Sequence, residues 1–164
     1  KTTLVNALKE LKQFKDYNFA TERSQHLMSL GIPLNTDSTL KGQTVFLAER
    51  CGELMHDKII TDRTVLDVMA FTMNAKSIPY QDKEAFETYA SEFVREYDYI
   101  FYISPHGLEI EDNGVRETDE HYRDLIDFTI TTLIKRHGHK CNTIEKISGS
   151  TKERIQQILT ITGL

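Results

Sequence analysis

Three polar segments in this sequence follow short extended stretches and could carry chemistry. They are Glu22-Arg23 after residues 17–20, Asp62-Arg63 after residues 58–61, and Ser104-Pro105-His106 after residues 99–103. A carboxylate can accept a proton or bind a metal ion, and an arginine binds phosphate oxygens in pairs and stays charged in a desolvated site. Polar loop tips are common, so one segment alone says little, but two acid-arginine pairs at equivalent strand ends are harder to explain as ordinary loop tips.

Lys1, Thr2 and Thr3 stand directly before a helical pattern of leucines at Leu4 and Leu8. They match the end of the phosphate-binding pattern G-x-x-x-x-G-K-[ST], in which backbone N–H groups surround the phosphates, the lysine reaches the β and γ oxygens, and the hydroxyl holds Mg²⁺. The glycines of that pattern do not precede Lys1 in the sequence. A surface lysine at the start of a helix is therefore the alternative interpretation.

Arg116 and Arg123 lie at the start of a long helical pattern, after the acidic, Gly-bearing segment 109–114. If a helix carries the second arginine, both guanidinium groups could reach one polyphosphate from a closing flap. Pairing with neighbouring acidic residues at the surface is the alternative, and it is about as good when the segment is read alone.

Two further clusters favour structural roles. His137, His139 and Cys141 alternate as zinc ligands on a strand would, but no second cluster completes a tetrahedral site, so the end of a helix followed by a core cysteine is the better interpretation. The tyrosines at 97, 99 and 102 could form a base-stacking platform, although packing against helices suits their placement better.

The elements that must position these residues alternate between strands and helices. Strands are predicted at 17–20, 58–61, 99–103 and 141–144, and helices after residue 3, at 43–56, 64–74, 82–96, 119–137 and from Ser150, where Glu153 completes a capping box. Such alternation predicts an α/β fold with a parallel sheet covered by helices on both faces. Ligands of such sheets bind beyond the carboxyl ends of the strands, where the polar segments lie.

The helical patterns also predict which side chains are buried. These are Phe86, Tyr89, Ala90, Phe93 and Tyr97 in the helix at 82–96, and Tyr122, Leu125, Ile126, Thr129, Leu133 and Ile134 in the helix at 119–137.

Length and composition restrict the class of protein. The chain has 164 residues and a mass of 19.0 kDa, which suits one domain. A net charge of -5 excludes a general positive field for nucleic acid, so a polyanion site must be local. There is no apolar stretch of about 20 residues and no apolar leader, and two cysteines do not make a disulfide framework. We expect a cytoplasmic protein with reduced thiols and no membrane partner.

Taken in order, these parts resemble the AAA-type small P-loop kinases related to thymidylate kinase, deoxynucleoside kinases and nicotinamide riboside kinase. The resemblance covers nearly the whole chain, and its segments are KTTLVNAL, FATERSQHL, KIITDRTVLDVMAF, EYDYIFYISP and VRETDEHYRDLIDFTITTLI. It implies a three-layer P-loop fold with an arginine-bearing lid. It also implies an ATP- and Mg²⁺-dependent kinase of a nucleoside, nucleotide or related ribosyl compound.

The resemblance further implies roles for individual residues. Lys1 would neutralise the β and γ phosphates, with Thr2 and Thr3 beside it, and Thr2 would hold Mg²⁺. Glu22 would accept the proton of the attacking hydroxyl, Arg23 and Arg63 would bind the acceptor, Asp62 would act on the metal shell or the hydroxyl, and Arg116 and Arg123 would close over the transferred phosphoryl group. The adenine would lie near residues 148–150.

The sequence departs from this family at its start, where the first strand and the glycine loop are missing. Since that strand is central in such sheets, we expect the complete protein to have about 175 to 180 residues. Two other functions stay open, a kinase of a hydroxyl in nucleic acid, such as a modified DNA base, and a non-catalytic nucleotide-binding switch. The sequence specifies neither the acceptor nor the oligomeric state, and a homodimer is compatible with it.

Overall fold

The computed structural model describes residues 2–21, 24–105 and 120–164, which form seven α-helices, four strands and short 3₁₀ turns in this part of the chain. The helices are α1 (Thr2–Lys9), α2 (Ser24–Ser29), α3 (Leu40–Glu53), α4 (Val65–Asn74), α5 (Tyr80–Ala90), α6 (Glu120–His137) and α7 (Thr151–Thr162). The strands are β1 (Asn18–Ala20), β2 (Ile59–Thr61), β3 (Tyr99–Tyr102) and β4 (Thr143–Lys146). The 3₁₀ turns are η1 (Lys12–Phe14), η2 (Asn35–Asp37), η3 (Ser91–Glu96) and η4 (Gly138–Lys140).

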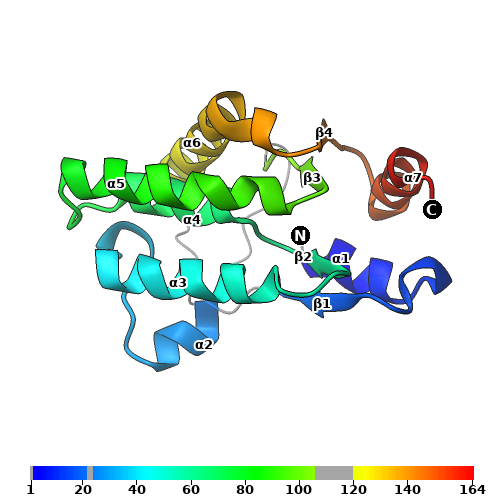
Figure 1. The fold of residues 1–164 in the computed structure, drawn as a ribbon, viewed down its shortest axis with the longest axis horizontal. Coiled ribbons are helices and arrows are strands. Elements are labelled where there is room, and N and C mark those ends of the chain that lie inside the picture. Colours follow the sequence, from blue (N-terminus) through cyan, green and yellow to red (C-terminus); the bar gives the residue numbers. More distant parts are fainter. Residues whose placement is uncertain (1, 22–23, 106–119) are drawn as a thin grey trace.

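The strands form two parallel pairs. Strand β1 pairs with β2 so that Phe19 lies opposite Ile60, and β3 pairs with β4 so that Ile100 lies opposite Ile144. Figure 1 shows β1 and β2 beside α1, apart from β3 and β4. The expected parallel pairing is confirmed, but within the described residues the strands make two separate sheets instead of one continuous sheet.

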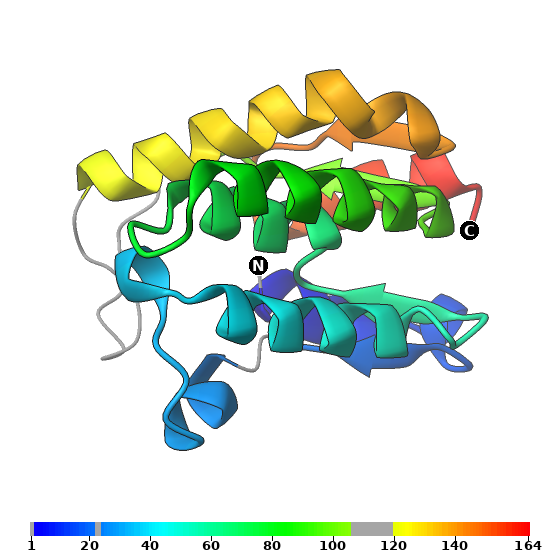
Figure 2. The same ribbon diagram turned by 60° about the vertical axis from the view of Figure 1, so that its left-hand side comes forward.

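Helices cover both faces of the strands, which gives the expected three layers. On one face α4 contacts α3, α5 and α6, and both views show α4 and α5 between α6 and α3 (Figures 1 and 2). On the other face α1 contacts α7. Neighbouring residues of β3 point to different cores, since Ile100 belongs to the core under α4 and Phe101 packs against the core of α1 and α7. This alternation buries both faces of the strand, as an α/β sheet requires.

Side-chain caps fix where three helices begin. The predicted capping box between Ser150 and Glu153 starts α7. A second capping box, between Thr64 and Asp67, starts α4 directly after the Asp62-Arg63 segment. The hydroxyl of Thr39 accepts a hydrogen bond from the Gly42 amide, which starts α3 three residues before the predicted position. Each cap satisfies amide groups that the first helical turn leaves without partners.

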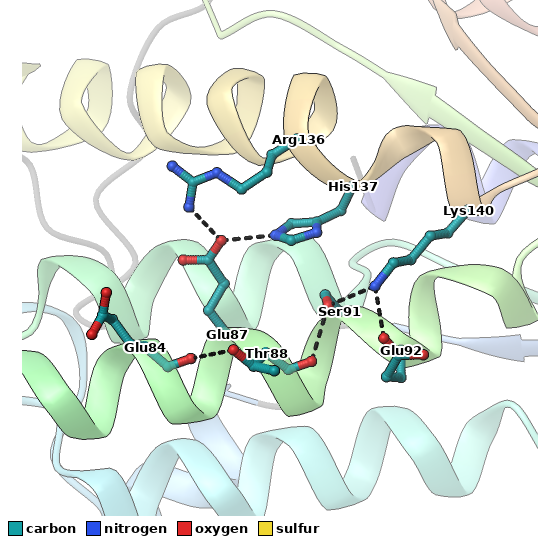
Figure 3. Close-up of polar contacts among 8 residues, drawn as sticks. All are labelled: Glu84, Glu87, Thr88, Ser91, Glu92, Arg136, His137 and Lys140. Atoms are coloured by element: carbon teal, nitrogen blue, oxygen red, sulfur yellow. Dashed lines mark hydrogen bonds and ion pairs between the residues drawn. The ribbon is translucent and has the colours of Figure 1, made fainter.

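A buried carboxylate joins α5 to the last turn of α6. Glu87 is 6% exposed, and its Oε1 accepts hydrogen bonds from Arg136 Nη1 at 2.5 Å and from His137 Nε2 at 2.7 Å. Next to it, Lys140 Nζ donates to Ser91 Oγ at 2.9 Å (Figure 3). Burial alone would raise the pKa of Glu87, but the hydrogen bonds from His137 and Arg136 outweigh it and hold that pKa below its ordinary value.

Two predicted core positions are wrong. Tyr89 is 63% exposed and Leu125 is 46% exposed. The buried face of α5 is centred on Phe86, Glu87 and Ala90, because the ion pairs of Glu87 turn a charged residue inward and rotate Tyr89 outward. The sequence pattern did not include Glu87, since acidic residues are rarely buried unless they are paired.

The interpretation of the histidine and cysteine cluster is confirmed. His137 ends α6, and Cys141 is 7% exposed with its thiol donating to the Tyr97 carbonyl oxygen at 3.1 Å. Among residues 2–21, 24–105 and 120–164, no group of three His, Cys, Asp or Glu side chains could hold a metal ion. No helix in the same residues is long and apolar enough to cross a membrane.

Candidate functional site

Two residues that are 60 positions apart in the sequence meet at the carboxyl end of β2. Thr2, the first residue of α1, donates a hydrogen bond from its Oγ1 to Asp62 Oδ2 at 2.8 Å. Asp62 follows β2, and its backbone amide donates to the Ala20 carbonyl oxygen at 3.2 Å, which extends the parallel ladder by one residue. The ladder therefore fixes the backbone of Asp62 and presents its side chain to the start of α1.

The second oxygen of the Asp62 carboxylate is one of several buried side-chain atoms without a hydrogen-bond partner in the described residues. Asp62 is only 7% exposed, and its Oδ1 is buried without a hydrogen-bond partner in the described structure. An unpaired buried carboxylate oxygen is unfavourable by a few kcal/mol at this depth. A bound cation would remove that penalty, and hydroxyl and carboxylate oxygens are the ligand types that Mg²⁺ prefers. Thr2 and Asp62 therefore fit a magnesium ion.

Arg63, the next residue, is held against the first turns of α4. Its Nη1 lies 3.9 Å from Asp67 Oδ1, and its guanidinium carbon lies 5.4 Å from the centre of the Phe71 ring. Asp67 is itself fixed, because its Oδ2 accepts a hydrogen bond from the Thr64 amide at 2.9 Å. A guanidinium placed over an aromatic face and beside a carboxylate has few alternative rotamers. The side chain thus has a defined position next to Asp62.

Arg123 reaches the same region from α6. Its side chain is 25% exposed, and its Nε lies 3.5 Å from Asp124 Oδ1. Four residues later on the helix, Asp127 accepts a hydrogen bond from the Tyr102 hydroxyl at 2.7 Å. Arg123 and Asp127 line the same cavity as Asp62 and Arg63.

This cavity, about 470 Å³ in volume, lies between β2 and β3. Every residue of β2 and every residue of β3 lines it, whereas no residue of β1 or β4 does. A cavity over the face of a strand would be lined by alternate residues, so lining by consecutive residues means that it runs along the two strand edges. Apolar side chains of α1 close one face, including Leu4, Val5 and Leu8.

The family resemblance implies that the adenine lies near the loop after β4. In this loop the backbone of Ser148 forms two hydrogen bonds with the side-chain amide of Gln157. Gln157 on α7 donates from Nε2 to the Ser148 carbonyl oxygen at 2.8 Å, and its Oε1 accepts from the Ser148 amide at 3.3 Å. Gly149 in this loop has φ 91°, a left-handed conformation that favours glycine.

Among the predicted site residues, Thr2 contacts Asp62, and Asp62, Arg63 and Arg123 line one cavity. Thr3 is exposed on α1 beside Thr2. The other four predicted residues lie outside the described residues, and they are Lys1, Glu22, Arg23 and Arg116.

Three residues that contribute to the site were not predicted. Asp67 holds Arg63, and Tyr102 binds Asp127 on α6. Sequence signals existed for two of them, because Asp67 stands at capping-box spacing after Thr64 and Asp127 lies four residues after Arg123 on one helical face. No local pattern indicates that Tyr102 would reach α6, since that contact depends on how helix and strand pack.

Comparison with known proteins identifies the family. No curated protein and no solved structure matches the chain. A family model described as AAA domain matches residues 1–154. This match spans nearly the whole chain and includes Thr2, Asp62, Arg63 and Arg123. The chain therefore belongs to the AAA domain family and has its α/β fold of the P-loop NTPase type.

Proposed function

We propose that this protein is a kinase that uses ATP and Mg²⁺ to phosphorylate a hydroxyl or phosphate group of a nucleoside, a nucleotide or a related ribosyl compound. The observation that carries the proposal is the contact between Thr2 and Asp62, in which one carboxylate oxygen is buried and lacks a hydrogen-bond partner. AAA-type P-loop domains generally bind a nucleotide with Mg²⁺. A threonine and an aspartate at the carboxyl end of a strand suit that ion.

Each described residue has a role in this proposal. Thr2 and Asp62 hold Mg²⁺, which when bound supplies positive charge to the phosphate oxygens. Arg63, fixed by Asp67 and Phe71, orients the acceptor. Arg123 approaches from α6 and stabilises the negative charge of the transferred phosphoryl group. Phosphoryl transfer needs positioning and charge neutralisation more than covalent assistance, and these residues supply both.

The roles of four further residues remain predictions from the family resemblance. Lys1 would bind the β and γ phosphates, Glu22 would accept the proton of the attacking hydroxyl, Arg23 would bind the acceptor, and Arg116 would act with Arg123. A carboxylate aimed at the acceptor favours a kinase over a nucleotide-binding switch, because a switch has no acceptor to deprotonate.

One labelling experiment tests the proposal against its alternatives. The protein is incubated with Mg²⁺, γ-labelled ATP and a panel of nucleosides, nucleoside monophosphates, nicotinamide riboside and DNA with modified bases. We expect label in a small molecule. Label in DNA would instead support the kinase of nucleic acid, and tight ATP binding without transfer would support the switch. Glu22→Gln should abolish transfer and leave the Kd for ATP within about twofold.

We also propose that a further parallel strand occupies the cavity between β2 and β3. Consecutive residues of both strands line this cavity, and the edges of parallel strands carry backbone N–H and C=O groups that need partners. A strand placed there would join the two pairs into one sheet of order β1-β2-new-β3-β4. Its carboxyl end would lie near Thr2 and Asp62, where a phosphate-binding loop is expected.

A further inference from the structure

Tyr102, the last residue of β3, contacts three other segments of the chain. Its hydroxyl donates to Asp127 Oδ1 at 2.7 Å and also hydrogen-bonds with the side chain of Ser104. The ammonium group of Lys146, on β4, lies 6.0 Å from the centre of the tyrosine ring. Burial and then the hydrogen bond to Asp127 raise the pKa of Tyr102 to about 12, so the phenol keeps its proton and acts as the donor at neutral pH.

The contact between Tyr102 and Asp127 ties α6 directly to a strand. The helix α6 also packs on α4, and its buried side chains such as Ile126 and Leu133 belong to the core that includes Ile100 of β3. Asn74 Nδ2 on α4 donates a hydrogen bond to Thr129 Oγ1 at 2.9 Å. Apolar packing of this kind is non-directional, whereas a short hydrogen bond to a carboxylate fixes one distance and one direction. The bond therefore sets where this part of α6 lies relative to the end of β3.

Arg123 lies one helical turn before Asp127, on the same face of α6. Four residues of helix span only about 6 Å along the axis, and one turn within a helix is stiff. Arg123, Asp127 and Tyr102 all line the cavity that also contains Asp62 and Arg63. Whatever fixes Asp127 therefore also fixes the direction from which Arg123 enters the site.

We propose that Tyr102 and Asp127 are positioning residues that hold Arg123 in the orientation needed for phosphoryl transfer. Neither side chain needs to touch the substrates, because both act through the placement of α6. The proposal rests on the proposed kinase function, since Arg123 is the residue whose action they support.

The kinetic test is a double-mutant cycle between Tyr102→Phe and Arg123→Ala. Loss of one hydroxyl that acts through Arg123 should lower kcat about 5- to 10-fold and leave KM for ATP and the acceptor within about twofold. In the Arg123→Ala background, Tyr102→Phe should have no further effect. Asp127→Asn is the second variant and should behave like Tyr102→Phe. The control is Tyr89→Phe on α5, because Tyr89 is 63% exposed and does not line the cavity, so kcat should not change.

Amide hydrogen exchange gives a readout that does not depend on kinase activity. Tyr102→Phe should speed exchange of the amides at 123–127 by about 5-fold or more, while the amides of α7 keep their rates. If the unsubstituted protein transfers no phosphate, the kinase proposal fails and the exchange result still tests the contact. Full kcat in Tyr102→Phe, an equal loss of kcat in the Arg123→Ala background, or unchanged exchange at 123–127 would each overturn the positioning role.

Discussion

At the scale of single residues, the proposed magnesium site depends on the carboxylate of Asp62. It lies at the end of β2 with one oxygen bonded to Thr2 and the other buried without a hydrogen-bond partner. Buried side-chain atoms without a hydrogen-bond partner also occur elsewhere in the described residues, Glu49 Oε2 among them, but Asp62 Oδ1 lies at a strand end beside the first residue of α1. The position of this oxygen beside Thr2 is what favours a cation as its missing partner.

Replacing Asp62 with asparagine tests this point. Asp62→Asn removes the negative charge and keeps the shape, so we expect phosphoryl transfer to fall at least about 100-fold and the Mg²⁺ dependence of ATP binding to be lost. Transfer of label from ATP and calorimetric titration of ATP with and without Mg²⁺ measure the two effects. Asp57→Asn is the matched control, because Asp57 also lines the cavity but is exposed and precedes β2. Equal effects of the two substitutions would contradict the metal role of Asp62.

The pairing of Thr2 with Asp62 could be predicted only in part from the sequence. Each residue type was recognisable, since Thr2 matches the end of a phosphate-binding pattern and Asp62 follows an apolar stretch. Their contact, and the burial of one oxygen, depend on how α1 packs beside β2, and no local rule specifies that distance. The same holds for Tyr102 and Asp127, whose contact joins a strand to a helix.

At the scale of elements, local chemistry predicted where several helices begin and long-range packing decided their faces. Ser150 with Glu153 forms the predicted capping box of α7. By contrast, α2 and the outward position of Tyr89 were not predicted. The exposure of Tyr89 follows from the burial of Glu87. That burial is possible because Arg136 and His137, on a helix about 50 residues further along the chain, donate hydrogen bonds to the Glu87 carboxylate.

Glu87 should make the stability of the protein depend on acid pH. Its pKa is lowered in the folded state, so its contribution is fully present above the ordinary value of 4.5 and is lost as the pH falls through the lowered folded-state value. Glu87→Gln should reduce the free energy of unfolding by about 1–3 kcal/mol at pH 7. The difference from the unsubstituted protein should shrink toward pH 3. Urea unfolding between pH 3 and pH 7 measures both effects.

The control for this prediction is Glu84→Gln. Glu84 lies three residues before Glu87 on α5 but is exposed, where it accepts a hydrogen bond from the Tyr80 hydroxyl at 2.7 Å. Its substitution should change the free energy of unfolding by less than about 0.5 kcal/mol. A Glu87→Gln variant whose loss of stability stayed constant from pH 7 to pH 3 would contradict the assignment.

Two glycines give opposite predictions for the same substitution. At Gly149 the left-handed φ of 91° strains any other residue, and a Cβ would lie 2.6 Å from Glu153 Oε2 in the capping box of α7. Gly149→Ala should lower the free energy of unfolding by about 1–2 kcal/mol. Gly52 lies within α3, and a Cβ added there would have no atom within 4 Å. Gly52→Ala should therefore raise the free energy of unfolding by up to about 1 kcal/mol. Thermal unfolding of both variants measures the signs, and equal signs would contradict the argument.

At the scale of the whole molecule, the sequence predicted the layers of helices correctly but predicted one continuous sheet where the described residues form two. Helices on both faces follow from alternating elements with apolar stripes, and the cores under α4 and between α1 and α7 have that arrangement. Continuity of a sheet depends on a neighbour for each edge. Among the described residues, β2 and β3 line a common cavity instead of pairing with each other, so one edge of each has no strand neighbour in this part of the chain.

A strand supplied ahead of Lys1 should therefore change the properties of the whole domain. We expect the 164-residue chain to bind a hydrophobic dye such as ANS through its cavity of about 470 Å³. Adding about six apolar, β-branched residues and a short glycine-rich loop before Lys1 should abolish dye binding and raise Tm by about 5 °C or more, because the added strand pairs with two edges and fills apolar space. The matched control carries proline at the centre of the same segment, which removes a ladder hydrogen bond and should restore dye binding. If both extended chains bind dye as the 164-residue chain does and melt at its Tm, the cavity does not take a strand.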